Sequence, residues 1–184
     1  MKTAITQNSN VEESWPRIES YLLKRGIKPD AVLLPGATLN QIGWAEAVLG
    51  VKLPVDFLEF YKIHNGQQPN VYGIVNGEEL MSLERIVEEW VMWQRIAATG
   101  VFDDTMANAD DGVQKVWHSR SWIPFTDDGL GNHLCLDMAP ANRGLRGQII
   151  RIWHDDTGRF RQAPSFGSWI SNFAYDLNKS AMFV

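Results

Sequence analysis

The feature that most constrains the fold of this chain is a change in hydrophobic period near its middle. Before about residue 100, apolar residues recur every three or four positions, which is the spacing of amphipathic helices. From Trp122 onward, short apolar runs are separated by tight turns rich in Asp and Gly, as in β-hairpins. Helices followed by a meandering sheet predict an α+β fold, with an antiparallel or mixed β-sheet flanked by helices.

The first part of the chain carries local signals that begin and end helices. A helix on Trp15, Ile18 and Leu22 is expected to end at Gly26, after which Pro29 prevents its return. Three more helices are expected before residue 100. Their boundary signals are Thr38 with Gln41, Gly50, Pro54, Asn65 with Gly66, Ser82 and Gly100.

The second part is expected to form the sheet and a closing helix. Residues 71–81 favour one or two short strands, and 101–118, which have no period, indicate a surface excursion. The closing helix, opened at Ser165, is expected to pack on the sheet through one apolar stripe, formed by Phe166, Trp169, Ile170, Phe173 and Leu177. Residues 1–10 are predicted to be a disordered arm and 11–184 a single domain.

Composition excludes several classes of protein. The single cysteine, Cys135, leaves no internal disulfide framework and no multi-cysteine zinc module. The formal charge of −5 argues against nucleic-acid binding, which requires clustered Lys and Arg. The start, Met1–Asn8, is too polar for a signal peptide, and no apolar run approaches the length of about 18 residues that spans a membrane. We therefore expect a cytoplasmic protein that binds neither nucleic acid nor membrane.

Three reactive side chains, His133, Cys135 and Asp137, share one face of a predicted strand. They could ligate zinc, and a thiolate next to an imidazole could act as a nucleophile. Same-face neighbours on a strand lie about 6.5–7 Å apart, so the favoured interpretation is a half-buried structural strand whose leucine face meets the core. The acidic turn at 127–132 does not match the EF-hand spacing. We expect no catalytic residues, no metal site and no cofactor.

The order of motifs resembles a known family. The run Leu53-Pro54-x-Asp56-Phe57, continuing to His64-Asn65-Gly66, resembles the helix signature of SMI1/KNR4 proteins in the SUKH superfamily. Downstream blocks follow in that family's order and extend the resemblance over residues 35–177. The residues that it marks as structural are Leu53, Pro54, Asn65, Gly66, Trp122, Pro124, Gly131, Asn132, Asp137 and Ser165.

The resemblance implies an α+β fold without a known catalytic centre. Bacterial relatives are mostly immunity proteins that bind and neutralise toxins, and the fungal namesake regulates cell-wall glucan synthesis and signalling. We hypothesise a non-enzymatic immunity protein that neutralises a cognate toxin, such as a nuclease, of a bacterial polymorphic or contact-dependent system. The alternative is a regulatory adaptor in cell-wall or cell-envelope assembly and signalling.

An acidic segment supplies a mechanism for binding a basic toxin domain. Between residues 78 and 89 the chain carries a run of glutamates with Arg85 as the only basic residue. Such a surface speeds encounter with a basic partner and selects it. The expected partner-binding residues are Glu84, Glu88, Glu89, Trp93, Asp103 and Asp104. The oligomeric state is left open.

Overall fold

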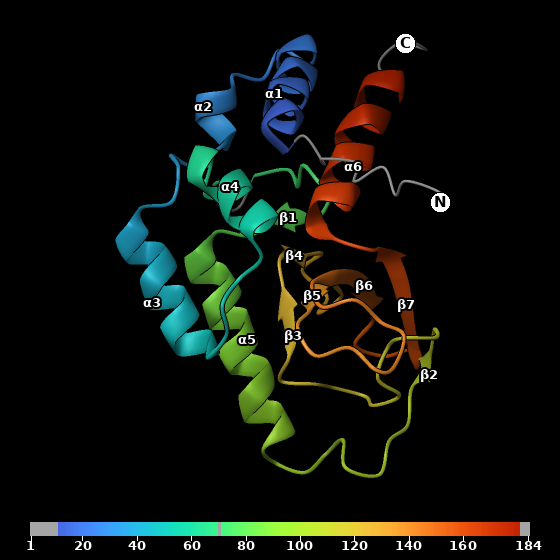
Figure 1. Ribbon diagram of the computed structural model, residues 1–184. Coiled ribbons are helices and arrows are strands. Elements are labelled where there is room, and N and C mark those ends of the chain that lie inside the picture. The colour runs from blue at the N-terminus through green and yellow to red at the C-terminus, as the bar shows by residue number, and fades with distance from the viewer. Residues whose placement is uncertain (1–10, 70, 181–184) are drawn as a thin grey trace, which may run out of the picture.

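The fold is built around a five-stranded sheet with the strand order β2-β7-β6-β5-β3. In this computed structural model, which describes residues 11–69 and 71–180, helices flank the sheet (Figure 1). The strands are β1 (Glu79–Leu80), β2 (Asn108–Ala109), β3 (Trp122–Pro124), β4 (Thr126–Asp127), β5 (His133–Asp137), β6 (Gln148–Ile152) and β7 (Gly158–Ala163). The helices are α1 (Ser14–Lys24), α2 (Pro29–Val32), α3 (Leu39–Leu49), α4 (Val55–Ile63), α5 (Leu83–Ala97) and α6 (Phe166–Ser180).

Strand pairing confirms the predicted α+β fold and makes the sheet mixed. Strands β3, β5, β6 and β7 are antiparallel neighbours, whereas β2 pairs in parallel with β7. A separate antiparallel pair joins β1 to β4, so the segment 71–81 does contribute a short strand. The predicted arm at residues 1–10 lies outside the described residues.

Helix boundaries follow the local signals with two differences. Thr38 forms the expected capping box, because its hydroxyl accepts from Gln41 N at 3.2 Å while the Gln41 side chain accepts from Thr38 N at 2.8 Å. Gly50 ends α3 in the left-handed conformation, with φ 69°. Pro29 was expected to prevent the return of the first helix; it also opens a new short helix, α2, where its missing N–H has no consequence. Pro54 precedes α4 as its cap residue instead of standing inside the first turn.

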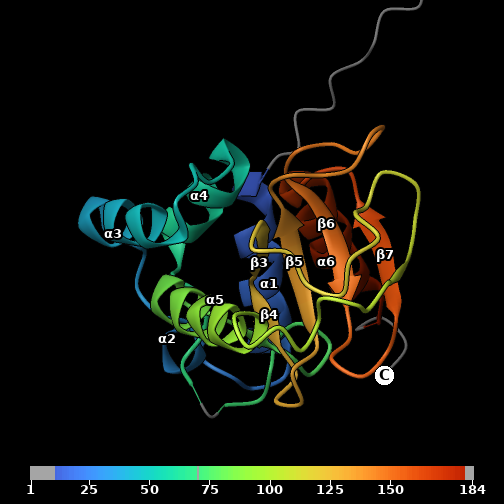
Figure 2. The same cartoon turned by 90° about the horizontal axis from the view of Figure 1, so that it is seen from below.

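An aromatic core joins α1, α4 and α6. Trp15 stacks on Phe60 with ring centroids 4.2 Å apart and donates its indole N–H to the Phe60 carbonyl at 2.8 Å. Phe166 packs edge-on against Phe57 and Phe60 at 4.9 and 5.2 Å. Figure 2 shows α1 and α6 together behind the sheet, with α3, α4 and α5 beyond its β3 edge. The predicted packing of the closing helix on the sheet is confirmed, because α6 contacts β6 and β7 as well as α1 and α4.

The apolar residues of α6 form two faces instead of the single stripe expected from the sequence. Phe166, Ile170 and Ala174 are completely buried. Trp169 and Phe173 are half-buried and stack on each other, with centroids 5.6 Å apart and rings inclined by 6°. Because Trp169 also packs edge-on against Phe125 at 5.0 Å, it covers the margin of the core while keeping part of its ring accessible.

The expectation that β5 is half-buried was wrong, because both of its faces are covered. Every residue from His133 to Asp137 is buried. The leucine face joins the main core, and Cys135 joins a second apolar cluster with Val113, Trp122, Ile150 and Ile152. The segment 101–118 supplies Val113 and strand β2, so part of the predicted surface excursion is packed against the sheet.

No helix among the described residues combines the length and the apolar character that crossing a membrane requires.

Candidate functional site

Helix α5 carries most of the expected partner-binding residues, but two of its glutamates point inward. Glu84 Oε1 accepts from Gln41 Nε2 at 2.7 Å, and its Oε2 accepts from Asn65 Nδ2 at 3.0 Å. Burial raises the pKa of Glu84, but its hydrogen bonds outweigh burial and hold the pKa below its ordinary value. This carboxylate connects α3, α4 and the beginning of α5.

Glu89 is likewise engaged within the protein. Its Oε1 lies 3.3 Å from Nε2 of His133, which is completely buried in β5. Burial raises the pKa of Glu89, but its contacts with His133, Arg85 and Trp93 outweigh burial and lower the pKa. Glu89 therefore faces the sheet and connects α5 to it.

Trp93 lies between the helix and the sheet and is half-buried. Its indole N–H donates to His133 Nε2 at 3.0 Å, and its ring stacks on His118 with centroids 5.8 Å apart. Phe102 lies 6.2 Å from the same indole ring, so Trp93 holds the segment after α5 against the helix. Burial, and then the charge of Arg159, lower the pKa of His118 to about 4, so this imidazole is neutral at neutral pH.

The remaining expected residues are exposed, one in the first half of α5 and two in the turn after the helix. Glu88 lies on the outer face of the helix, and Asp103 and Asp104 lie in the turn that follows it. Met92 and Ile96, one and two helical turns beyond Glu88, are each 36% exposed. The structure therefore divides the six predicted residues into an exposed acidic group, two internal glutamates and one half-buried tryptophan.

The three reactive side chains of β5 are each held by other partners. His133 Nδ1 donates to the Thr126 carbonyl at 2.7 Å, so in the neutral ring Nε2 is the acceptor for Trp93. Burial raises the pKa of the Cys135 thiol well above its usual range. Burial also raises the pKa of Asp137, which accepts from Gln148 Nε2 at 2.9 Å. Within residues 11–69 and 71–180, no group of three or more His, Cys, Asp or Glu side chains is placed to hold a metal ion.

The residues of the first family motif connect helices. Leu53 N donates to Glu46 Oε1 at 3.0 Å, and Pro54 caps α4 beside it. Asn65 Oδ1 accepts from Leu83 N at 2.9 Å, which satisfies a backbone donor at the start of α5. Gly66 has a φ of 73°, and a side chain there would lie 2.6 Å from backbone oxygens of neighbouring residues.

The later motif residues arrange turns and strand ends. Asn132 donates to Asp128 Oδ2 at 2.6 Å and accepts from His154 N at 2.9 Å, which ties the β4–β5 turn to the end of β6. Ser165 Oγ accepts from Ser168 N at 3.1 Å at the start of α6. Of the other four members, Trp122 and Pro124 are buried in β3, Gly131 has a φ of 90°, and Asp137 accepts from Gln148 as described above.

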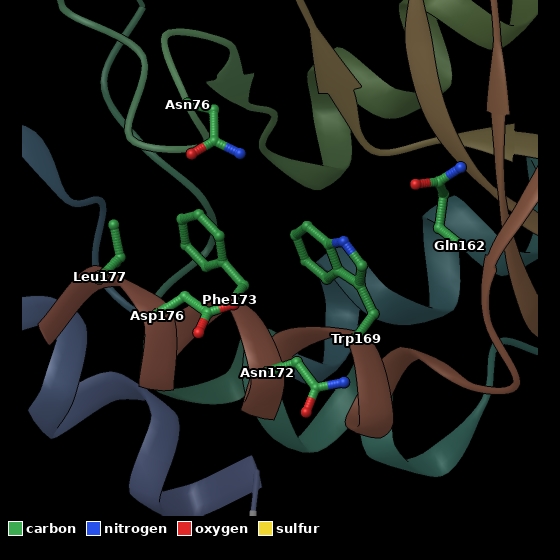
Figure 3. Close-up of a pocket in the computed structure, with 7 residues that line it drawn as sticks. All are labelled: Asn76, Gln162, Trp169, Asn172, Phe173, Asp176 and Leu177. Carbon is green, nitrogen blue, oxygen red and sulfur yellow. The ribbon is translucent and has the colours of Figure 1, made fainter. Parts of the chain in front are cut away.

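Sequence reasoning missed a groove beside α6. Two adjoining hollows of about 270 and 280 Å³ share four lining residues, namely Asn76, Gln162, Trp169 and Phe173. The available signal was the spacing of Trp169 and Phe173, which lie one turn apart and off the line of Phe166 and Ile170. No pattern in the local sequence indicates that Gln162 of β7 and Asn76 of the loop before β1 also line this groove (Figure 3).

Comparison with known proteins identifies the family. The model of the SMI1 / KNR4 family (SUKH-1) matches residues 36–172. The chain is 31% identical to "Cell wall biosynthesis/cell cycle regulator smi1" of Schizosaccharomyces pombe, with 95% of this chain and 37% of that protein covered. It is 27% identical to "Cell wall assembly regulator SMI1" of Saccharomyces cerevisiae, with 95% and 42% covered. It is 26% identical to "Glucan synthesis regulatory protein" of Neurospora crassa, with 95% and 40% covered.

These relatives contradict the hypothesis of a bacterial immunity protein with a toxin partner, because they are named as fungal regulators of cell-wall assembly and glucan synthesis. The resemblance gave a regulatory role in cell-wall assembly as the alternative, and these relatives favour that alternative. The chain spans about two-fifths of the length of these curated relatives. The match over residues 36–172 covers most of the chain, which therefore belongs to the SMI1 / KNR4 family (SUKH-1).

Proposed function

We propose that this chain is a non-enzymatic, protein-binding domain that acts in the cytoplasm in the regulation of cell-wall assembly. The observation that carries the proposal is the similarity to named cell-wall regulators over 95% of the chain. Because the similarity extends over nearly the whole fold, we assign the contribution to cell-wall regulation to the whole domain rather than to one motif.

The environment of the reactive side chains supports binding rather than catalysis. The thiol of Cys135 is completely buried and its pKa is raised by burial, which disfavours the nucleophilic thiolate. Both ring nitrogens of His133 have partners inside the protein, at Thr126 and Trp93. His133 stabilises the contact between α5 and the sheet, and Cys135 packs in the second apolar cluster, which leaves recognition to the exposed surface.

The proposed partner-binding surface follows the exposed face of α5 from Glu88 onward and continues into the turn after the helix. It combines the exposed carboxylates of Glu88, Asp103 and Asp104 with the partly exposed side chains of Met92 and Ile96. Carboxylates around an apolar centre suit a protein partner with a basic rim, because rim charges speed encounter while apolar contacts hold the complex. Trp93, Glu84 and Glu89 act beneath this surface by fixing the position of α5.

A domain exchange tests the proposed function. The matching segment of the Saccharomyces cerevisiae cell-wall assembly regulator is replaced by this chain, and growth is measured on a dye that stresses the cell wall. We expect the chimera to support growth. A variant with Glu88→Gln, Asp103→Asn and Asp104→Asn is expected to lose much of that support. The matched control carries Asp30→Asn, Glu59→Gln and Asp155→Asn, three exposed carboxylates elsewhere, and is expected to behave like the unmodified chimera.

The proposal is contradicted if the chimera accumulates to the level of the native regulator and growth still fails. If both triple variants support growth equally well, the proposed surface is wrong.

A further inference from the structure

One buried nitrogen atom, Nε2 of His133, faces two groups that make opposite demands on it. The indole nitrogen of Trp93 lies 3.0 Å from Nε2, and Oε1 of Glu89 lies 3.3 Å from it. The other ring nitrogen, Nδ1, lies 2.7 Å from the Thr126 carbonyl, which can only accept, so Nδ1 carries a proton in either charge state of the ring. The presence or absence of a proton on Nε2 therefore decides between Trp93 and Glu89.

Each charge state of His133 satisfies one of these groups and leaves the other in an unfavourable contact. Without a proton, Nε2 accepts from Trp93, but its lone pair faces the Glu89 carboxylate, whose pKa lies below its ordinary value. With a proton, Nε2 donates to Glu89, but two N–H groups then face each other across the 3.0 Å to Trp93. The contact can therefore adopt two arrangements, and the charge of one imidazole selects between them.

Trp93 connects this contact to the turn after α5. Its ring stacks on His118 at 5.8 Å and lies 6.2 Å from Phe102. Phe102 lies 6.1 Å from the same imidazole, so the three rings form one cluster. The two exposed aspartates of the proposed partner-binding surface follow Phe102 directly in the chain. Movement of the indole would therefore remove contacts that hold this acidic turn in place.

We propose that protonation of His133 regulates the proposed partner-binding surface. The neutral ring holds Trp93 and the acidic turn in place, and the protonated ring binds Glu89 and displaces Trp93. The inference rests on the proposed protein-binding function, because it concerns the regulation of the same surface. Acidification makes the turn less ordered, and a partner must then lose more conformational entropy to order it.

Other ionisable groups lie close to this contact, and the test has to separate them from His133. Burial lowers the pKa of His118 to about 4, so this ring stays neutral in mildly acidic solution. A side chain at Gly131 would lie 3.3 Å from His154 and 3.7 Å from Trp93, so the exposed imidazole of His154 is also near the indole. The ionisable groups around the contact are Arg85 and Glu89 of α5, Glu79 of β1, Asp127 of β4, Cys135 of β5, Arg159 of β7, His118 and His154.

The test is an NMR titration of the folded, ¹⁵N-labelled chain from about pH 8 to about pH 5, the range in which histidine ordinarily titrates. It follows the imidazole nitrogens of His133 and the indole N–H of Trp93, which are assigned with His133→Gln and Trp93→Phe. We expect both signals to change with the same midpoint. On the acidic side, the backbone order parameters of residues 101–104 should fall below about 0.6, the range of flexible segments.

The proposal is overturned if His133 takes up a proton while the Trp93 signal and the order of the turn stay unchanged. It is also overturned if His133 takes up no proton before the protein unfolds.

Two conservative variants should move the midpoint of the His133 signal in opposite directions, which a merely structural role would not produce. Glu89→Gln keeps the shape of the side chain but removes the negative charge, and should lower the midpoint by about 1 pH unit or more. Trp93→Phe keeps a ring but removes the donor that favours the neutral imidazole, and should raise the midpoint by up to about 1 pH unit. Shifts in the same direction would overturn the proposal.

The matched control is His154→Gln, which removes the exposed imidazole near the same indole and should leave the midpoint unchanged. A transition of the Trp93 signal that disappears in this control would assign it to His154 and overturn the proposal. The titration uses the chain alone, so its outcome is separate from that of the domain exchange. If the chimera supports growth and Trp93 does not respond to His133, the inference alone is wrong. A coupled transition in a chain whose chimera fails would support the switch and contradict only the proposed function.

Discussion

Removing the side chain of Asn65 is expected to destabilise the fold through the start of α5. Asn65 is 4% exposed, and its amide bonds both the backbone of Leu83 and the carboxylate of Glu84. In Asn65→Ala the buried N–H of Leu83 loses its acceptor, which costs about 1–3 kcal/mol. Glu84 keeps its bond from Gln41, so the second loss is smaller. We therefore expect a decrease of about 2–4 kcal/mol in the free energy of unfolding.

The pH dependence of this difference provides a second check. The pKa of Glu84 lies below its ordinary value of 4.5 because hydrogen bonds, that of Asn65 among them, outweigh the effect of burial. A lowered pKa stabilises the folded state above the ordinary pKa and ceases to do so as the pH falls through the lowered value. The difference between wild type and Asn65→Ala should therefore be largest above pH 4.5 and become smaller in more acidic solution.

Urea unfolding followed by tryptophan fluorescence measures both quantities. The matched control is Asn40→Ala, an exposed asparagine on α3, which should change the free energy of unfolding by less than about 0.5 kcal/mol. An Asn65→Ala protein as stable as the Asn40→Ala protein would refute the inference that Asn65 connects α4 to α5.

Three further expectations concern local structure. Thr38→Ala removes the capping box and should lower the free energy of unfolding by about 1 kcal/mol in urea titrations, and a change near zero would contradict the cap. Gly50→Ala should lower the free energy of unfolding by about 1–2 kcal/mol, because its backbone is left-handed. Gly66→Ala should lower it further, because of the two sites only Gly66 would place a side chain against backbone oxygens. Equal melting temperatures of the two variants would refute this. Cys135 should react with iodoacetamide at pH 8 only as fast as the protein unfolds, because its thiol is buried, and immediate labelling of the native protein would contradict that burial.

The sequence predicted those parts of the fold in which a few neighbouring residues determine the conformation. The capping box at Thr38 and the left-handed Gly50 depend on contacts within one helical turn, and both are present. The α+β class followed from the change in hydrophobic period. The opening of α2 at Pro29 was not predicted, because proline both ends helices and begins them, and only tertiary packing decides which occurs.

Features that depend on distant residues could not be predicted. His133 is buried because Trp93, Glu89 and Thr126 supply its partners, and two of these lie about forty residues away in the chain. For the same reason Glu84 and Glu89 were expected at the surface, since a run of acidic residues does not indicate which members have internal partners. The groove at Trp169 is formed by side chains from separate elements, so no local pattern marks it.

The central claim is that this domain contributes to the regulation of cell-wall assembly. The most direct measurement is the incorporation of labelled glucose into wall β-glucan, in cells whose SMI1-type regulator carries this chain in place of its own matching segment. We predict that the chimera restores most of the β-glucan lost when that segment is deleted, and that a version destabilised by Gly66→Ala restores less. Incorporation that stays at the level of the deletion, although the chimera is folded and abundant, would contradict the account.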